Sequence, residues 1–379
     1  MRIAHVANFY GPTSGGLRTA MHALGRGYTD RGHTVLLVVP GAEDADEATE
    51  YGRRITLASP VLPLSGGYRV ISRTRELKGI LQGFRPDVLE ISDRTTLRGL
   101  GAWAGRHGIP AVFFAHERAD GILAAHLPAR LGSSTAVSAL ADAHNRGTAR
   151  RFATLVCTTE YAAEELRRIG ADPELVPLGV DLETFHPSRF DQSVRDELAS
   201  SDERLLVMAS RLSAEKRPDL AIEATRILVE RDEPVRLVCL GTGAVEREVR
   251  TLAAGLPVDF LGFVSGRERF AKLLAAADAV IAPGPIETFG LAALEALACA
   301  TPVVVNAASA LPEVVGSAGV AADGTAEAFA DAVHEVLARP EEERREAARA
   351  RAEQLPWSRT VEAMLDVHER LHTRPAADV

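Results

Sequence analysis

The sequence predicts an α/β protein in which two Rossmann-like domains, each a doubly wound parallel sheet, follow one another along the chain. The length of 379 residues suffices for about two domains, and 46% hydrophobic with 25% charged residues is typical of globular proteins. Short apolar runs alternate with amphipathic helical stretches. The runs are largely continuous, as expected of parallel strands that helices cover on both faces.

The first half of the chain contains one set of these alternating elements. The predicted strands are Arg2–Ala7, Thr34–Val39, Val88–Ile91, Ala111–Ala115 and Thr154–Cys157, and the predicted helices are Leu17–Arg31, Val70–Phe84, Thr96–His107 and Glu160–Ile169.

A break follows near the middle of the chain. The stretch Val176–Pro187 holds two prolines and a glycine and has no helical period, which is typical of a linker. Beyond it, Pro218–Arg231 begins with proline and aspartate and shows a clear apolar stripe. We therefore expect domains over residues 1–182 and 183–356. The predicted strands of the second domain are Arg204–Met208, Val235–Leu240, Val258–Leu261, Ala279–Ala282 and Val303–Val305.

Charge and apolar content exclude several classes of protein. A net charge of −9 disfavours general nucleic-acid binding. No apolar run approaches the roughly 20 residues that span a bilayer, and residues 1–10 lack the pattern of a signal peptide, so we expect a cytoplasmic protein. Cys157, Cys239 and Cys299 lie in apolar or alanine-rich runs without metal-ligand spacing and are expected to be buried and unpaired. The oligomeric state stays open.

Ligands of open parallel sheets bind at the carboxyl ends of the strands, so we expect a site in the cleft between the two domains, formed by loops that follow strands. The first such loop is Asn8–Gly16 (NFYGPTSGG). Gly15 and Gly16 directly precede a helix, where free backbone amides and the helix dipole favour an anion. The spacing is not that of a dinucleotide-binding loop, and a flexible turn explains it equally well.

The second loop, Ser210–Lys216 (SRLSAEK), follows the first strand of the second domain. Arg211 and Lys216 lie five residues apart just before a helix, and such a pair of cations would neutralise a diphosphate. Taken alone, the segment is explained equally well as a surface loop with two ordinary cations.

The third segment, Pro285–Thr301 (PIETFGLAALEALACAT), follows the strand Ala279–Ala282. Glu287 precedes a predicted helix and Glu295, eight residues later, lies within it, so the two carboxylates are predicted to point to nearly the same side. Their neighbours are apolar, which a solvated face does not explain. One acid could bind a sugar and the other a ribose. A phosphate between them could meet the amides of Thr288, Phe289 and Gly290.

Together these motifs resemble the retaining GT-B nucleotide-sugar glycosyltransferases of family 4. The resemblance covers essentially the whole chain and rests on the E-x7-E element from Glu287 to Glu295 followed by ALACATPVV, on SRLSAEKRPD, and on the N-terminal GG loop. Thr288 and Ala300 stand where the family often has proline and glycine, and neither departure removes a polar group. The stretches most similar to actinobacterial mannosyltransferases, relatives of the phosphatidylinositol mannosyltransferases, are SGGYRV (65–70), EISDRTTLRGLG (90–101) and HERAD (116–120).

The resemblance implies roles for these residues. Arg211 and Lys216 would hold the donor diphosphate. Glu287 would bind the hydroxyls of the transferred sugar and His116 would lie beside it, although a structural histidine at a strand end is the alternative. Glu295 would bind the ribose, Gly16 would donate its amide to the departing phosphate, and the segment at 263–264 would flank the base. The implied donor-binding residues are Gly15, Gly16, Ser210, Phe263, Val264, Thr288, Phe289, Gly290, Leu291 and Glu295, and the implied acceptor-side residues are Tyr68, Arg69, Arg73, Asp93, Arg94 and Glu117.

The implied activity is metal-independent transfer of a hexosyl group from a nucleotide-sugar, with GDP-mannose favoured over a UDP-sugar, to a hydroxyl of a lipid-linked or small-molecule acceptor. The anomeric configuration would be retained, no cofactor would be needed, and the departing phosphate would take the acceptor proton. The resemblance further implies that the C-terminal helix, Ser358–His372, returns to the first domain, so that residues 357–379 complete it.

The acceptor has two candidate classes. After Gly66 and Gly67, the segment Tyr68–Lys78 is expected to place four cations on one short helix. In lipid-acceptor relatives this region touches anionic membrane, which favours a phosphoinositide acceptor and a peripheral location at the inner membrane surface. A solvated helix beside a soluble sugar or cyclitol explains the segment equally well. The four cations are Arg69, Arg73, Arg75 and Lys78.

Other functions fit the sequence less well. A GT-A transferase needs a metal-binding D-x-D, which Asp44 and Asp46 form, but the polar stretch Gly41–Glu50 is better explained as a solvated loop. A sugar-nucleotide 2-epimerase shares the expected fold, yet its acid and base residues are not recognisable. A glycosyl phosphorylase would need a pyridoxal lysine. A catalytically inactive nucleotide-sugar-binding protein would be expected to lack His116 or Glu287.

Overall fold

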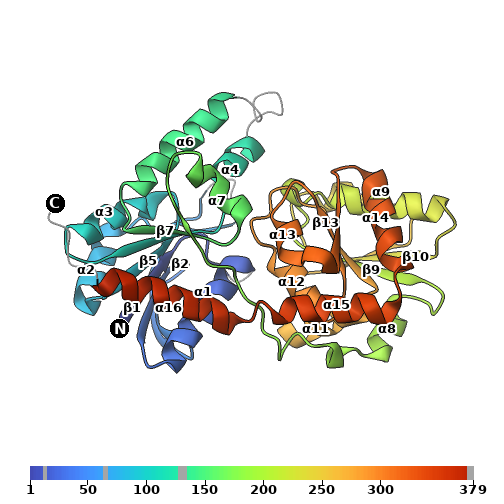
Figure 1. The fold of residues 1–379 in the computed structure, drawn as a ribbon, viewed down its shortest axis with the longest axis horizontal. Helices are drawn as coiled ribbons and strands as arrows, with labels where there is room; N and C mark the ends of the chain where they lie inside the picture. The colour runs from blue at the N-terminus through green and yellow to red at the C-terminus, as the bar shows by residue number, and fades with distance from the viewer. Residues whose placement is uncertain (12–14, 63–66, 127–134, 374–379) are drawn as a thin grey trace. The chain divides into compact units, whose positions relative to one another are not determined.

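A computed structural model describes residues 1–11, 15–62, 67–126 and 135–373. It divides the chain into two compact units, which we call unit 1 (Met1–Leu178 with Trp357–Val379) and unit 2 (Gly179–Pro356). Each unit is a sheet of mostly parallel strands with helices packed on it (Figure 1). The predicted α/β architecture of two parallel-sheet domains is confirmed.

Unit 1 contains an eight-stranded sheet in the order β3-β4-β2-β1-β5-β6-β7-β8. All neighbouring strands are parallel except β3 and β4, which pair antiparallel at one edge. Strand β1 lies between β2 and β5, and its residues are almost entirely buried. The strands are β1 (Arg2–Ala7), β2 (Thr34–Gly41), β3 (Ala45–Thr49), β4 (Gly52–Ala58), β5 (Val88–Ser92), β6 (Ala111–Ala115), β7 (Thr154–Cys157) and β8 (Glu174–Leu175).

Helices lie on both faces of this sheet. On one face α2 and α3 pack their apolar residues against those of β1, β2 and β5. On the other face α1 packs against the C-terminal helix α16, which also contacts β5 (Figure 1). The helices of unit 1 are α1 (Gly16–Asp30), α2 (Thr74–Phe84), the 3₁₀ turn η1 (Thr96–Arg98), α3 (Gly99–Gly105), α4 (Ala119–His126), α6 (Thr135–Ala149), α7 (Glu160–Arg167) and α16 (Trp357–Thr373).

Several elements of unit 1 differ from the prediction, and the strands β4 and β8 were not predicted. Part of the stretch expected to be a polar loop, Gly41–Glu50, is the edge strand β3, whose side chains are exposed and pair with β4 through Asp46 with Arg53 and Glu47 with Arg54. A strand without buried residues carries no apolar signature, so the sequence pattern missed it. The helices α4 and α6 were also not predicted.

Helix α2 begins at Thr74 rather than at Val70. Val70 and Ile71 are buried, which mimics a helical stripe, but they follow an isolated antiparallel bridge between Val61 and Arg69 and lie outside the helix. The prediction of four cations on one helix is therefore wrong: only Arg75 and Lys78 lie within α2. Gly66 is outside the described residues.

Unit 2 contains a six-stranded, fully parallel sheet in the order β11-β10-β9-β12-β13-β14. Helices α9 and α14 pack on one face, where they form a core with β9, β10 and β12, and α12 packs against α11 and α15. The elements are η2 (Pro187–Arg189), α8 (Gln192–Leu198), β9 (Arg204–Ala209), η3 (Ala214–Lys216), α9 (Pro218–Glu230), β10 (Val235–Leu240), α10 (Glu246–Leu252), β11 (Val258–Gly262), α11 (Arg267–Ala276), β12 (Ala279–Ala282), α12 (Leu291–Ala298), β13 (Val303–Asn306), α13 (Leu311–Val315), η4 (Gly316–Ala318), β14 (Gly319–Ala322), α14 (Ala326–Ala338) and α15 (Glu341–Glu353).

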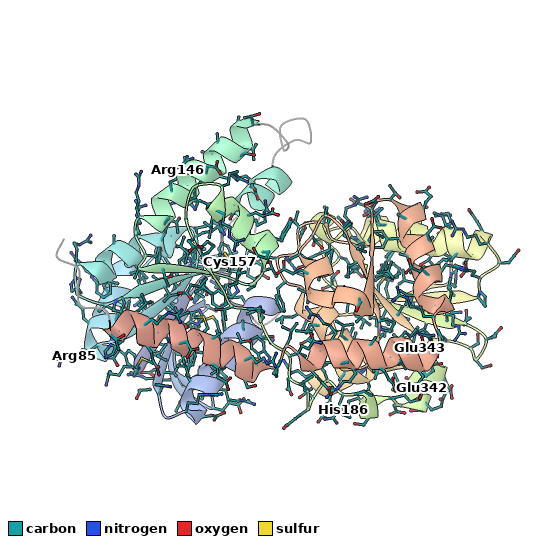
Figure 2. All side chains as sticks on the ribbon, in the orientation of Figure 1. Arg85, Arg146, Cys157, His186, Glu342 and Glu343 are labelled. Carbon is teal, nitrogen blue, oxygen red and sulfur yellow. The ribbon has the colours of Figure 1, made fainter. Side chains whose placement is uncertain are left out.

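The cysteines are buried, as expected. Cys157 lies in the interior of unit 1, whereas Glu342 and Glu343 are exposed on α15 (Figure 2). All three cysteines are buried and unpaired, and burial raises the pKa of each thiol to about 12, so none is a reactive thiolate. In the part of the chain that the structure describes, no helix is long and apolar enough to cross a bilayer.

Candidate functional site

In unit 2 backbone hydrogen bonds join the loops that follow β9 and β10. The Ser210 amide donates to the Leu240 carbonyl at 3.1 Å, and the Leu212 amide donates to the Thr242 carbonyl at 3.0 Å. A Cβ on Gly241 would lie 2.1 Å from the Ser210 oxygen, so no other residue fits there. The loop that begins at Ser210 therefore has a fixed course at the carboxyl edge of the sheet.

Lys216 ends this loop, and its ammonium forms an ion pair with the Glu287 carboxylate in the loop after β12. The two side chains are 19% and 23% exposed, so the pair is shielded from bulk water while remaining accessible. Gly284 lets the two loops approach, since a Cβ there would lie 3.2 Å from the Glu215 carbonyl oxygen. The structure thus joins the second and third motifs of the sequence through this pair.

Arg211 is placed differently from Lys216. Its guanidinium is 53% exposed and lies 3.2 Å from Glu215, which also accepts a hydrogen bond of 2.6 Å from the Ser213 hydroxyl. The loop's two predicted cations therefore pair with different carboxylates. Arg211 is a solvent-accessible cation beside the more enclosed Lys216.

The segment between Glu287 and α12 is held by its backbone. The Ala310 amide donates to the Glu287 carbonyl at 2.9 Å. Phe289 is buried and Gly290, at φ 78°, is the residue before the helix. A Cβ on Gly290 would lie 2.3 Å from Leu311, so both the positive φ and the close approach require glycine. Thr288 and Leu291 flank these two residues at the helix start.

Glu295 lies on α12 and is only partly exposed. Among the described residues its carboxylate has no hydrogen-bond or salt-bridge partner. Burial raises its pKa to about 7, opposed by the nearby Arg267 and reinforced by Asp181. An accessible yet unpartnered carboxylate is typical of a ligand site. The prediction that Glu287 and Glu295 point to the same side assumed helical spacing between them. Because Glu287 precedes α12 and does not lie on it, helical spacing does not determine how the two carboxylates are oriented.

The remaining predicted residues of unit 2 follow the edge strand β11. Phe263 is 54% exposed and Val264 is half-buried. An exposed phenylalanine next to a strand end offers an apolar face to a planar ligand.

In unit 1 the glycine loop leads directly into α1. Helix α1 begins at Gly16, both Gly15 and Gly16 are exposed, and no side chain caps the helix. Gly15 has φ −74°, and a Cβ there would meet nothing within 4 Å, so neither backbone conformation nor packing requires glycine. The residues between Gly11 and Gly15 are outside the described part.

His116 follows β6 and is half-buried in unit 1. Its Nε2 lies 2.9 Å from the Ser92 hydroxyl, and its ring packs against Phe114 with 4.3 Å between centroids. Burial lowers the pKa of His116 to about 3, and the positive charges of His5 and Arg94 act in the same direction, against the negative charge of Glu90. His116 is therefore a neutral imidazole at neutral pH.

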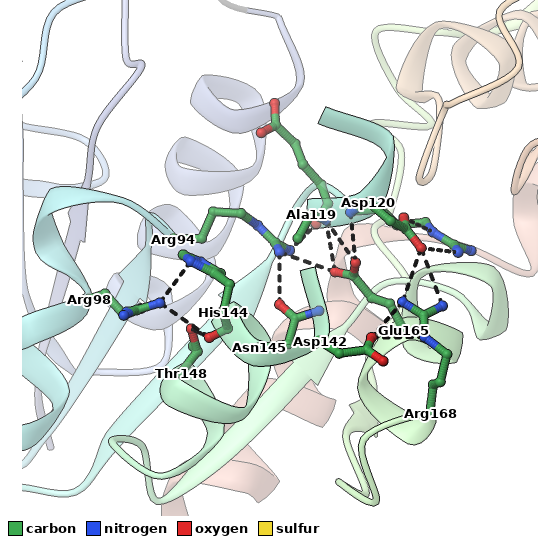
Figure 3. Close-up of polar contacts among 12 residues, drawn as sticks. Arg94, Arg98, Ala119, Asp120, Asp142, His144, Asn145, Thr148, Glu165 and Arg168 are labelled. Atoms are coloured by element: carbon green, nitrogen blue, oxygen red, sulfur yellow. Dashed lines mark hydrogen bonds and ion pairs between the residues drawn. The ribbon is translucent and has the colours of Figure 1, made fainter. Parts of the chain in front are cut away.

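The loop after His116 is held by a buried pair, Arg94 and Glu165 (Figure 3). Arg94 Nη1 lies 3.1 Å from Glu165 Oε1, and Nη2 donates to the Glu117 carbonyl. The Glu165 carboxylate accepts from the Ala119 amide at 2.8 Å. Both charged side chains thereby hold the backbone of residues 117–119, which directly follow His116.

The Asp93 carboxylate also binds backbone amides of the protein. Its carboxylate accepts from the Thr95 amide at 3.0 Å and from the Leu97 amide at 2.8 Å, which caps η1. Of the predicted acceptor-side residues at this edge, Asp93 and Arg94 are buried, and Glu117 has an exposed side chain.

The other predicted acceptor-side residues lie near the loop after β1. The Phe9 amide donates to the Arg69 carbonyl at 3.3 Å, and the Phe9 ring meets Tyr68 edge-on at 6.0 Å. Arg69 donates to the Ser59 carbonyl at 2.5 Å. Arg73 bonds Asp44 at 2.6 Å.

The D-x-D carboxylates both meet arginines, since Asp44 pairs with Arg73 and Asp46 with Arg53. Each arginine lowers the pKa of its partner carboxyl. The two carboxylates thus act as counter-ions of the β3–β4 hairpin and of the start of α2.

Three buried polar residues behind His116 were not predicted from the sequence, namely His5, Glu90 and Ser92. Glu90 stands in the otherwise apolar strand VLEIS, and a carboxylate in a strand buried on both faces must have partners. A glutamate within an apolar strand was therefore a signal in the sequence from which these three residues could have been identified.

Two family models match the chain. The model described as glycosyl transferases group 1 matches residues 190–354, and that of a glycosyl transferase 4-like domain matches residues 15–179. A GDP-mannose-dependent alpha-(1-6)-phosphatidylinositol dimannoside mannosyltransferase from Mycobacterium tuberculosis is 47% identical over 368 residues, which cover 96% of this chain and 95% of that protein.

Solved structures share the fold. A sucrose-phosphate synthase from Thermosynechococcus elongatus superposes with a TM-score of 0.78 at 20% identity and covers 98% of this chain and 99% of its own. HepE from Anabaena, in complex with UDP and glucose, superposes with a TM-score of 0.74 at 19% identity over 99% of this chain and 100% of its own. These similarities extend over both units.

Proposed function

The chain belongs to the group 1 glycosyl transferases, with a glycosyl transferase 4-like N-terminal domain, and on this basis we propose that it transfers mannose from GDP-mannose to a phosphatidylinositol-based glycolipid. It is a glycosyltransferase that uses a nucleotide-sugar. The observation that carries the proposal is the 47% identity to the mycobacterial mannosyltransferase over nearly the full length of both proteins. The GDP-mannose donor and the glycolipid acceptor come to this chain from that similarity.

We assign donor binding to unit 2. Lys216 and Arg211 bind the diphosphate, Glu287 binds hydroxyls of the sugar, and Glu295 accepts hydrogen bonds from the ribose. The partly enclosed Lys216–Glu287 pair and the unpartnered Glu295 support this assignment, because together they suit a ligand with both phosphate and vicinal hydroxyls. The exposed Phe263 offers a surface for the base.

The reaction breaks the bond between the anomeric carbon and the diphosphate oxygen and forms a bond from that carbon to an acceptor hydroxyl oxygen. Negative charge builds on the departing diphosphate, and cations held nearby stabilise it more in the transition state than in the ground state. The departing phosphate takes the acceptor proton, and attack from the same face retains the configuration. No metal or cofactor is part of this proposal.

We assign the acceptor to unit 1, where His116 contacts the transferred sugar and the Gly16 amide contacts the departing phosphate. A neutral imidazole suits a hydroxyl, since it offers one donor and one acceptor. The buried Arg94 and Asp93 support the acceptor edge by holding its backbone rather than by touching ligand.

Membrane contact is proposed for the part of unit 1 around α2. Arg75 is exposed and Lys78 half-buried on α2, and neither forms a salt bridge within the described residues, whereas Arg69 and Arg73 bond to the protein. Val61 and Leu62 are 47% and 38% exposed, which adds apolar surface. Unpaired cations and exposed apolar side chains suit an anionic lipid surface, so we propose a peripheral, cytoplasmic-side location.

Donor and acceptor are tested by measuring nucleoside diphosphate release from GDP-mannose and UDP-glucose, with and without phosphatidylinositol mannosides in vesicles. We expect release and mannolipid formation only with GDP-mannose and the glycolipid. Transfer to a soluble inositol acceptor but not to the glycolipid would refute the lipid assignment, and acceptor-independent formation of free sugar with release of nucleotide would indicate the epimerase-type alternative.

Membrane contact is tested by co-sedimentation with vesicles rich in anionic lipid. The double variant Arg75→Gln/Lys78→Gln is expected to sediment several-fold less, because each cation near an anionic surface contributes about 1 kcal/mol. The matched control is Arg226→Gln/Arg231→Gln on α9 and its C-terminal end in unit 2, which removes the same charge and should sediment like the parent. Equal sedimentation of both variants would reject this surface.

A further inference from the structure

Asn306 is a buried polar residue at the end of a strand, next to the loop that carries Glu287. It is the last residue of β13, after three valines, and it is 2% exposed. Strand β13 pairs with β12, so the end of β13 lies beside the loop that follows β12. A buried amide in an apolar strand needs hydrogen-bond partners, and the partners of Asn306 indicate its role.

The two ends of the Asn306 amide bind different loops. Its Nδ2 donates to the Pro283 carbonyl at 2.8 Å, and its Oδ1 accepts from the Ala308 amide at 2.9 Å. These partners determine which end is which, because a carbonyl can only accept a hydrogen bond and a backbone N–H can only donate one. The first bond reaches the loop after β12, and the second closes a turn in the loop after β13.

The bond to Pro283 fixes the first residue of the loop after β12. Pro283 is buried, and no other hydrogen bond to its carbonyl is found in the part of the chain that the structure describes. A buried carbonyl without a partner is costly. Without the Nδ2 of Asn306 we therefore expect this loop to shift until the Pro283 carbonyl meets water.

The loop after β13 also holds Glu287, the residue at the other end of the same segment. The Ala310 amide donates to the Glu287 carbonyl at 2.9 Å. Ala310 is placed by the turn that begins at Asn306, whose carbonyl accepts from the amide of Ser309 at 3.2 Å and from its hydroxyl at 2.8 Å. The segment 283–287 is thus bonded at its first and last residues to one turn, residues 306–310.

This segment contacts the loop that carries Lys216. Gly284 follows Pro283, and a Cβ on Gly284 would lie 3.4 Å from Lys216 Cα. The Lys216 ammonium in turn forms the ion pair with the Glu287 carboxylate. A displacement of the segment 283–287 would therefore change both the contact between the two loops and the position of the carboxylate opposite the ammonium.

We propose that Asn306 is a positioning residue that holds the Glu287 carboxylate, and with it the Lys216–Glu287 pair, in the geometry that transfer requires. This role rests on the proposed function, in which Glu287 binds hydroxyls of the sugar and Lys216 binds the diphosphate. Asn306 itself does not touch the donor. It acts through its hydrogen bond to Pro283 and through the turn that places Ala310.

The main test variant is Asn306→Ser. A serine hydroxyl can accept from the Ala308 amide but is too short to reach the Pro283 carbonyl, so only the bond between the loops is lost. We expect kcat for transfer from GDP-mannose to phosphatidylinositol mannosides in vesicles to fall about tenfold, because displacing reacting groups by about 1 Å costs up to about 100-fold. An unchanged kcat would overturn the proposal.

Binding of GDP separates positioning of Glu287 from a general loss of structure. GDP has no sugar for Glu287 to bind, and Lys216 lies on a loop with its own backbone bonds, such as that from the Leu212 amide to the Thr242 carbonyl. Calorimetry should therefore show nearly the same GDP affinity in Asn306→Ser as in the parent. A loss of GDP affinity as large as the loss of kcat would reject the positioning role.

A double-mutant cycle tests whether Asn306 acts through Glu287. In the Glu287→Gln background, Asn306→Ser should lower kcat little further, because the group that Asn306 positions is already changed. An undiminished loss in that background would reject the proposal. The matched control Thr225→Val removes a buried side-chain donor from a bond of the same length, 2.8 Å to the Ala221 carbonyl in α9, and should keep the parent kcat.

Hydrogen exchange of the full-length protein measures the positioning without activity. The bond to the Glu287 carbonyl protects the Ala310 amide, so this amide should exchange several-fold faster in Asn306→Ser than in the parent or in Thr225→Val. If the serine variant does not fold, Asn306→Asp replaces it, because the carboxylate keeps the bond to Ala308 and cannot donate to Pro283. Parent-like exchange in the folded variant would contradict the proposal.

The two kinds of measurement distinguish the proposal from the proposed function. If Glu287→Gln transfers as fast as the parent while Asn306→Ser still speeds exchange of the Ala310 amide, the function proposed for Glu287 fails, although Asn306 is shown to position it. If Glu287→Gln is impaired and Asn306→Ser changes neither exchange nor kcat, the proposed function stands and the positioning role of Asn306 fails.

Discussion

Lys216 and Glu287 form an ion pair between two loops whose residues lie 71 positions apart in the sequence. The first loop follows β9 and the second follows β12, and these strands are neighbours in the sheet of unit 2. The pair fixes an ammonium at the carboxyl edge of the sheet, with the carboxylate as its counter-ion. In the proposed donor site, an ammonium held in this way would bind a phosphate without further ordering of its long side chain.

We expect Lys216→Met to lower kcat for transfer at least about 100-fold, since a fixed donor aimed at developing charge contributes about 2.7–4 kcal/mol. Methionine keeps the apolar stem and removes only the charge. The control is Lys272→Met, which breaks a more exposed ion pair of 2.8 Å with Asp191 in the same unit. Comparable losses in both variants would show that general charge, not Lys216, is responsible.

Binding of GDP should weaken as the pH falls through 7. Burial raises the pKa of Glu295 to about 7, so at pH 6 only a minority of molecules present the carboxylate that we propose accepts hydrogen bonds from the ribose hydroxyls. Calorimetry at pH 8 and pH 6 should give an affinity loss of up to about tenfold. In Glu295→Gln the loss should be much smaller, and an identical pH dependence in that variant would assign the effect to another group.

The raised pKa of Glu295 should also make the stability of the protein depend on pH. Burial raises the pKa of Glu295 from 4.5 to about 7, so between these values the folded protein holds a proton that the unfolded chain releases. The contribution of Glu295 to the free energy of unfolding is therefore most favourable below pH 4.5, declines as the pH rises and is least favourable above pH 7. We expect Glu295→Gln to have a higher Tm than the parent at pH 8, with a smaller gap at pH 5.5. A pH-independent gap would contradict this.

Removing the buried carboxylate of Glu165 should destabilise unit 1 by about 3 kcal/mol or more, because Arg94 would be left buried without its charge partner. Both tryptophans, Trp103 and Trp357, belong to unit 1, so their fluorescence during urea unfolding reports on this unit. The variant is Glu165→Gln.

The neighbouring residue provides a matched control for that measurement. Glu164 is 63% exposed and pairs at 2.8 Å with Arg118, which keeps Asp120 as a second partner, so Glu164→Gln should change stability by less than about 1 kcal/mol. Similar unfolding curves for the two glutamine variants would show that the buried pair does not stabilise unit 1.

The sequence predicted the central strands well and the edge poorly, for a physical reason. Arg2–Ala7, Ala111–Ala115 and Thr154–Cys157 have the predicted bounds because strands buried on both faces are continuously apolar. The edge strand β3 has only exposed or half-exposed residues, so nothing in its composition distinguishes it from a polar loop. Val70 and Ile71 are buried although they lie outside a helix. The spacing of apolar residues alone does not distinguish such residues from the buried face of a helix.

For the candidate site, local motifs identified residues but not their partners. Arg211 and Lys216 looked equivalent in the sequence, yet one pairs with Glu215 and the other with Glu287. Arg94 was grouped with the acceptor-side residues, and the structure places it against Glu165, where it holds the loop after His116. Partners of this kind are set by chain segments that are distant in sequence.

The sequence by itself determined the α/β class, most of the strands in the interiors of the two sheets, and the loop motifs, because apolar runs and loop motifs are local properties of the chain. Only the tertiary structure decided which charges are neutralised and by which residues. His5 and Glu90 meet because parallel pairing aligns β1 with β5, and His368 reaches Glu90 because α16 packs beside α1. Electrostatic interactions depend on distance and burial in space, and neither can be calculated from separation along the sequence.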